Sequence, residues 1–169
     1  MKIIGLVLLT AAAAAIGVFK ASELKKCVAA LSELIAFLEL IRNEICTRRT
    51  PMKQLMSANN LHEYKYIKPF TSALDEHMNM LGNMSFSQIW TECVNENISF
   101  ISEESRSCLI NLGSSLGRYD AQLQAAAIDR CINALEREYK DLCTDLKSNQ
   151  KMYIGLGTGM GLIVSIILI

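Results

Sequence analysis

Charged side chains are confined to the middle of this chain. Apart from Lys2, every Asp, Glu, Lys and Arg lies between Lys20 and Lys151, so residues 3–19 and 152–169 carry no charge. As a helix, each uncharged stretch would extend about 25–27 Å, close to the roughly 30 Å hydrocarbon core of a bilayer. The sequence therefore predicts transmembrane helices at residues 1–19 and 152–169, with a polar domain at residues 20–151 between them.

The N-terminal stretch also has features of a cleavable signal peptide, with Lys2, an apolar run and then small residues. The segment Val18–Ser22 lacks a convincing small-x-small cleavage site, and the second uncharged stretch makes a two-span hairpin the simpler interpretation. A secreted helical protein with a cleaved leader stays open as an alternative.

The distribution of positive charge near the predicted spans indicates their orientation. The cationic residues of the central domain near the spans are Lys20, Lys25, Lys26, Arg137, Lys140, Lys147 and Lys151. The opposite side of the membrane would have only Lys2 and the terminal amine. Because cytoplasmic segments carry the excess of Lys and Arg, we expect residues 20–151 to face the cytoplasm. An extracytoplasmic helical sensor or ligand-binding domain anchored by two spans is the alternative.

Helical periodicity dominates the central domain. From Ser22 to Thr47, apolar residues recur every three or four positions, as in one face of a helix. This predicted seam is Leu24, Val28, Leu31, Ile35, Leu38, Ile41 and Ile45. A second seam follows Asp120 and comprises Ile128, Cys131, Leu135, Tyr139, Leu142 and Leu146. We therefore predict an all-α antiparallel helical bundle whose first and last helices continue into the two transmembrane helices.

Turn and capping signals predict short helices between the two long ones. Thr50-Pro51 would begin one that runs through Leu55 and Met56, and a second is expected from Lys68 to Leu81. Ser85 and Gln88 have the spacing of a capping box. Ser102 would begin a further helix, with acidic residues in its first turn.

The sequence offers little for catalysis, cofactors or metals. His62-Glu63 begins like a zinc-binding H-E-x-x-H motif, but Tyr66 occupies the second histidine position. His77 is expected on a solvated helix face. The six cysteines form no C-x-x-C pair, and the 17 basic and 17 acidic residues balance, which argues against nucleic-acid binding. We predict no enzymatic activity, no cofactor, no metal site and no catalytic residue.

Small residues in the two uncharged stretches predict close helix packing. They lie at helical spacing, where they let two backbones approach in lipid. The predicted packing residues are Gly155, Gly157, Gly159, Gly161 and Ser165 in the C-terminal stretch, with Ala13 and Gly17 in the N-terminal stretch. They would pack either between the two spans or against the helix of a partner, which includes a second copy of the chain.

The segment Leu112–Asp120 is the most distinctive part of the central domain. Its leucines and glycines read as a helix end, a tight turn and a new helix start. Gly113 lies inside the helix, where its cost of about 1 kcal/mol relative to Ala requires a close backbone contact. We expect a well-packed helix–helix corner; the functional alternative is a docking surface made of Leu112, Gly113, Leu116, Gly117, Asp120 and Gln124.

From end to end, the chain resembles the stage III sporulation protein AB family of spore-forming Firmicutes. The resemblance rests on the N-terminal span, the Leu-Gly corner and the glycine-rich C-terminal span. The matching positions are Glu39 to Glu44 before Thr50-Pro51, Leu112-Gly113, Leu116-Gly117, Asp120, Gln124, Leu135-Glu136, Lys151-Met152-Tyr153, Gly155, Gly157 and Gly161. The alanine run in the first span and the six cysteines are not among the features that carry the resemblance.

This resemblance implies a fold similar to the cytoplasmic helical domain of the type II secretion platform protein F. It implies a membrane subunit of the channel that links mother cell and forespore, located in the outer forespore membrane with its bundle in the mother-cell cytoplasm. The implied partners are a secretion-type sporulation ATPase and other channel proteins of the same operon. The resemblance implies no catalytic residues.

Overall fold

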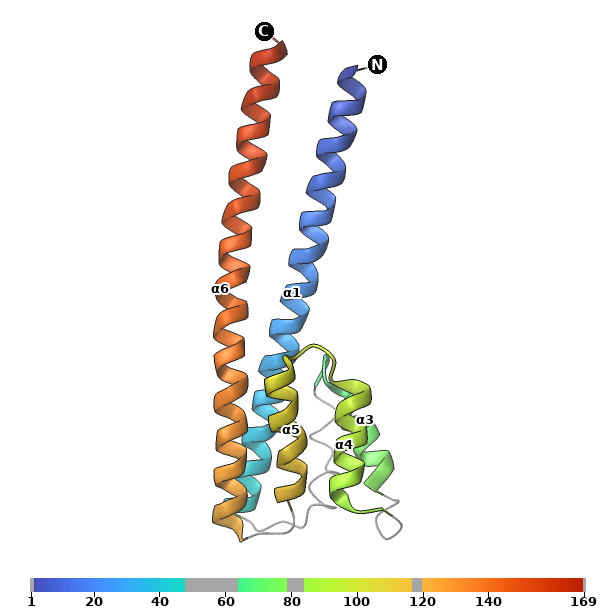
Figure 1. Cartoon of the computed structure of the whole chain (residues 1–169), viewed down its shortest axis with the longest axis vertical. Coiled ribbons are helices and arrows are strands. Elements are labelled where there is room, and N and C mark those ends of the chain that lie inside the picture. The colour runs from blue at the N-terminus through green and yellow to red at the C-terminus, as the bar shows by residue number, and fades with distance from the viewer. Residues whose placement is uncertain (1, 48–63, 79–83, 117–119, 169) are drawn as a thin grey trace. The chain divides into compact units, whose positions relative to one another are not determined.

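The computed structural model of the chain is all-α. It describes residues 2–47, 64–78, 84–116 and 120–168, with side chains described in 22–47, 64–78, 84–116 and 120–148. The described residues form five helices, in the order α1, α3, α4, α5 and α6, and these pack as a helical bundle (Figure 1). The predicted fold class is confirmed at this level.

The first helix, α1, spans Lys2–Thr47 without interruption. It ends where the sequence predicts, and Leu31, Leu38, Ile41 and Ile45 of the predicted seam are buried. The buried face is wider than that seam because it also includes Leu34 and Phe37.

Three short helices follow, and each has a local sequence signal at its start. Helix α3 spans Lys68–His77, with Pro69 in its first turn. Helix α4 spans Phe86–Asn97 and opens with the predicted capping box, in which Ser85 and Gln88 each bond to the backbone N–H of the other. Helix α5 spans Glu103–Ser115, and the Ser102 side chain caps it as predicted.

The last helix, α6, spans Ala121–Leu168, directly after Asp120 as predicted. Its seam is buried at Ile128, Cys131 and Leu135, whereas Tyr139 is only partly buried. Arg42 of α1 binds Asp129 of α6, and residues earlier in α1 lie beside residues later in α6, so the two helices run antiparallel within the bundle.

The chain divides into two compact units. Unit 1 comprises residues 1–28 and 141–169, and unit 2 comprises residues 29–140. Helices α1 and α6 contribute to both units. In the part of the chain whose side chains are described, no helix has the length and apolar character needed to cross a membrane. The side chains of the predicted spans, and the short helix predicted through Leu55 and Met56, lie outside the described residues.

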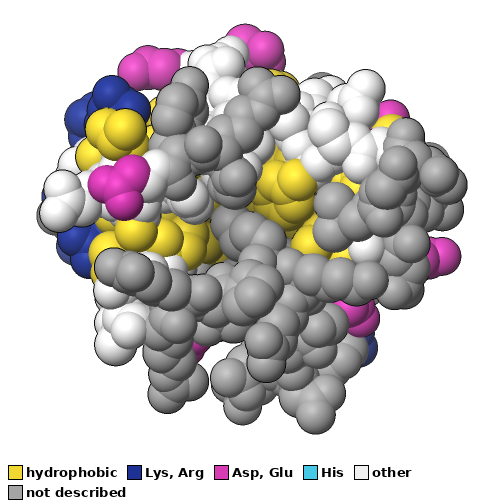
Figure 2. All heavy atoms as spheres, turned by 90° about the horizontal axis from the view of Figure 1, so that it is seen from below, with side chains coloured by type: hydrophobic (Ala, Val, Ile, Leu, Met, Phe, Trp, Pro, Cys, Tyr) yellow, Lys and Arg dark blue, Asp and Glu magenta, His cyan; other side chains and the backbone are white. Residues whose placement is uncertain are grey.

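A chain of aromatic rings organises the core of unit 2. The Phe37 ring of α1 meets the Phe70 ring of α3 edge-to-face at 5.8 Å between centroids, and Phe70 meets Trp90 of α4 in the same manner at 5.5 Å. Phe37, Phe70 and Trp90 are fully buried. The rings therefore tie α1, α3 and α4 into one core. At the end of the molecule shown in Figure 2, hydrophobic side chains are visible toward the middle of the face, and charged ones lie mainly toward its edge.

Carboxylates from the long helices hold the amino ends of two short helices. Helix α3 lacks a side-chain cap of its own, and Glu33 of α1 accepts the N–H groups of Lys65, Tyr66 and Ile67 at 2.6–3.1 Å. Glu138 of α6 accepts both the N–H and the hydroxyl of Ser102, at 2.6 and 2.9 Å, where α5 begins. Negative charge is favourable at these positions because the helix dipole is positive there.

We predict that Glu33→Gln lowers the free energy of unfolding by about 1 kcal/mol, because the neutral amide keeps only one acceptor oxygen for the three N–H groups. Glu39→Gln makes the same chemical change at an exposed position of the same helix and should stay within about 0.5 kcal/mol of wild type. Chemical denaturation of the purified chain measures both values. An equal decrease in the free energy of unfolding in the two variants would contradict the capping role of Glu33.

Candidate interaction surface

The predicted Leu-Gly corner lies at the carboxyl end of α5 and the start of α6. Leu112, Gly113 and Leu116 are buried, Gln124 is partly buried and Asp120 is exposed. Gly117 lies outside the described residues. Three of the six candidate residues therefore lie in the core. A partner could reach Asp120 directly, but not the buried leucines.

The close contact expected at Gly113 is with Trp90 of α4. A Cβ atom at position 113 would lie 2.3 Å from Cδ1 and 2.7 Å from Cγ of the indole. The indole Nε1 donates a hydrogen bond of 2.7 Å to the Leu109 carbonyl oxygen, one turn earlier in α5. Glycine is therefore required because the indole lies directly on the helix backbone.

We predict that Gly113→Ala destabilises the chain by about 1–2 kcal/mol. The clash with Trp90 costs about 1–3 kcal/mol, and the higher helix propensity of Ala offsets up to about 1 kcal/mol. Ser114→Ala, at the next and exposed position, is the matched control and should change the free energy of unfolding by less than about 0.5 kcal/mol.

The effect of Gly113→Ala on the free energy of unfolding should change sign when the indole is absent. In a Trp90→Leu background the clash is removed, so Gly113→Ala should stabilise the chain by up to about 1 kcal/mol through helix propensity alone. Chemical denaturation of the four chains of this cycle measures the coupling. If Gly113→Ala lowered the free energy of unfolding equally in both backgrounds, contact with Trp90 would not be the reason that position 113 requires glycine.

The predicted transmembrane packing residues lie in parts of α1 and α6 whose side chains are outside the described residues. This applies to Gly155, Gly157, Gly159, Gly161, Ser165, Ala13 and Gly17. Their packing stays a prediction.

A cysteine and a histidine meet between α3 and α4, a contact that sequence reasoning missed. Cys93 Sγ lies 3.7 Å from His77 Nδ1, so His77 is partly buried against α4 and not on the solvated face that we expected. Burial, with smaller contributions from Glu96 and Glu92, raises the pKa of the Cys93 thiol to about 11. At neutral pH this thiol is therefore protonated, which disfavours a role as a nucleophile.

The six cysteines lie in different environments. Cys93 and Cys131 are buried, Cys46 is exposed and the other three are intermediate. Burial raises the pKa of the Cys131 thiol, with Cys108 beside it as a further cause. Among the described residues, no group of three His, Cys, Asp or Glu side chains could hold a metal ion.

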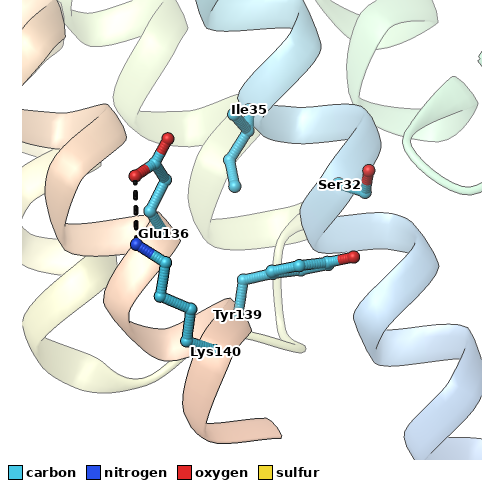
Figure 3. Close-up of a pocket in the computed structure, with 5 residues that line it drawn as sticks. All are labelled: Ser32, Ile35, Glu136, Tyr139 and Lys140. Carbon is cyan, nitrogen blue, oxygen red and sulfur yellow. Dashed lines mark ion pairs between the residues drawn. The ribbon is translucent and has the colours of Figure 1, made fainter. Parts of the chain in front are cut away.

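An open groove separates α1 and α6 (Figure 3). Ser32 and Ile35 line it from α1, and Glu136, Tyr139 and Lys140 line it from α6. The Tyr139 ring extends toward α1, and Lys140 Nζ lies 3.6 Å from Glu136. Small-molecule sites usually enclose their ligand and direct several polar groups at it. The described lining of this groove does neither, so we assign it no ligand.

The chain matches one family model over nearly its whole length. The model is described as Stage III sporulation protein AB, and the match covers residues 2–169. Neither the curated proteins nor the solved structures gave a match.

Proposed function

Because the chain belongs to the stage III sporulation protein AB family, we propose that it is a platform subunit of the channel between mother cell and forespore. Membership of this family implies a role in stage III of sporulation. In the proposed mechanism, a cytoplasmic secretion-type ATPase moves against the bundle, and the two long helices pass that movement to the membrane. The role is mechanical and involves no catalysis or cofactor.

One observation supports this proposal above the others: α1 and α6 run without a break from the uncharged ends into the packed core. Helix α1 has 46 residues and includes both the uncharged stretch 3–19 and the core residues Leu31 to Ile45. Helix α6 has 48 residues and joins the core around Leu135 to the stretch 152–169. The two prolines are Pro51 and Pro69, so neither long helix contains the usual cause of a sharp kink.

Contacts within unit 2 would make the two long helices respond together. Arg42 and Asp129 form a two-point ion pair between α1 and α6, and the second contact, from Nη2 to Oδ2, measures 3.2 Å. Glu33 and Glu138 attach the short helices to α1 and α6, respectively. A push on α3 or α5 would therefore reach a long helix through direct hydrogen bonds, and a push on α4 would reach α5 through the hydrogen bond from Trp90 to the Leu109 carbonyl oxygen.

The proposal places the protein in the outer forespore membrane, with residues 20–151 in the mother-cell cytoplasm. Its proposed partners are the secretion-type ATPase, the other channel proteins of the operon and a second copy of itself. The support is the family match together with the charge distribution, because the cations near the predicted spans lie almost wholly in the central domain.

Two insertions after Ser148 test whether the long helix transmits movement. A Gly-Ser insert of about seven residues, two helical turns, should abolish formation of heat-resistant spores because it replaces a stiff connection by a flexible one. An Ala-rich helical insert of the same length adds the same number of residues but keeps the helix continuous, and it should preserve much more function.

The count of heat-resistant spores in a strain that lacks the native protein gives the result. Both inserted proteins should accumulate and unfold at the wild-type temperature, which separates transmission from folding. Full activity of the Gly-Ser variant would refute the proposed coupling.

A further inference from the structure

One side of α6 carries a basic surface that the bundle leaves exposed. Ala126, Arg130, Asn133 and Arg137 are exposed and follow one another at spacings of three and four residues, so they line one side of the helix. The opposite side is buried. Neither arginine forms an ion pair with another residue in the described part of the chain. We call these four residues the basic surface.

The outward side of α4 carries the opposite charge. Gln88, Glu92, Asn95 and Glu96 are exposed, and the buried residues of this helix lie on its other side. Glu92 and Glu96 are one turn apart, so they repel each other. Both lie close enough to Cys93 to raise the pKa of its thiol, after the larger effect of burial. We call these four residues the acidic surface.

The two surfaces belong to one unit of the fold but to helices on different sides of it. Both lie within residues 29–140, and in Figure 1 α6 stands at one side of this unit while α3 and α4 stand at the other. The chain has 17 basic and 17 acidic residues, so its charges balance overall. The basic and acidic surfaces nevertheless lie on two separate helices. One copy could not pair the two surfaces with each other, whereas two copies could.

We propose that the basic surface on α6 of one copy docks against the acidic surface on α4 of a second copy. Each surface is an exposed helix face with two like charges and an asparagine between or beside them, so the two are complementary in charge. Because two different surfaces meet, the contact is heterologous. Each dimer therefore keeps one free basic surface and one free acidic surface. Repetition of this contact builds a ring or a row of platform subunits.

Charge reversal tests the pairing on the full chain in detergent micelles, with self-association measured by energy transfer between two labelled pools. Arg130→Glu with Arg137→Glu, or Glu92→Lys with Glu96→Lys, should each weaken self-association about tenfold or more, because attraction becomes repulsion. An equimolar mixture of the two variants should associate again, since the acidic α6 of one then meets the basic α4 of the other. Raising salt from about 0.05 to 0.5 M should weaken the wild-type contact.

Matched controls change the net charge equally at exposed sites on α1. Lys25→Glu with Lys26→Glu controls for the arginine reversal, and Glu23→Lys with Glu39→Lys controls for the glutamate reversal. Both should associate like wild type. A monomeric wild-type chain, unchanged association of the reversed variants, or failure of the mixture to recover would each overturn the proposal; the first result would assign the basic surface to an acidic partner of another kind.

Discussion

The packing of the short helices depends on the position of the Trp90 indole. Its ring meets Phe70 of α3 edge-to-face, lies near Phe86 of its own helix and rests on the backbone of α5 at Gly113. Its N–H is satisfied by the Leu109 carbonyl oxygen, so burial of the only tryptophan leaves no polar atom unpaired there. A large, rigid side chain with one polar atom can thus set the distance between α4 and α5 and orient α3 against α4.

The long helices form the frame to which this assembly is attached. Phe37 of α1 extends the aromatic contacts to the frame, and the carboxylates of Glu33 and Glu138 fix the starts of α3 and α5. The frame thus supplies both apolar and charged contacts to the short helices. The same helices continue into the uncharged ends, which supports the proposed role in transmitting movement.

The sequence predicted the features that depend on neighbouring residues. The capping box at Ser85, the cap at Ser102 and the start of the last helix after Asp120 are local, and all are present. The cost of a glycine inside a helix correctly indicated a close contact at position 113. Its partner could not be predicted, because the contact joins two helices that are separate in the chain.

Other features depend on tertiary structure in the same way. The contact of His77 with Cys93 joins two helices, and Glu33 accepts three N–H groups more than 30 positions away, so neither had a local signal. The predicted seam of α1 included Ile35 and omitted Leu34 and Phe37, because a seam of period 3.5 describes contact with one helix. Helix α1 contacts both α3 and α6, which requires a wider apolar face.

The proposed function requires the bundle to stand in the cytoplasm on two membrane-anchored helices. Ser148, an exposed residue of α6 between the core and the second uncharged stretch, is the position to probe. In a chain with Ser148→Cys as its only cysteine, a membrane-impermeant thiol reagent is applied to intact and to lysed cells. We predict labelling only after lysis. Labelling in intact cells would place the bundle outside the cytoplasm and contradict the platform function.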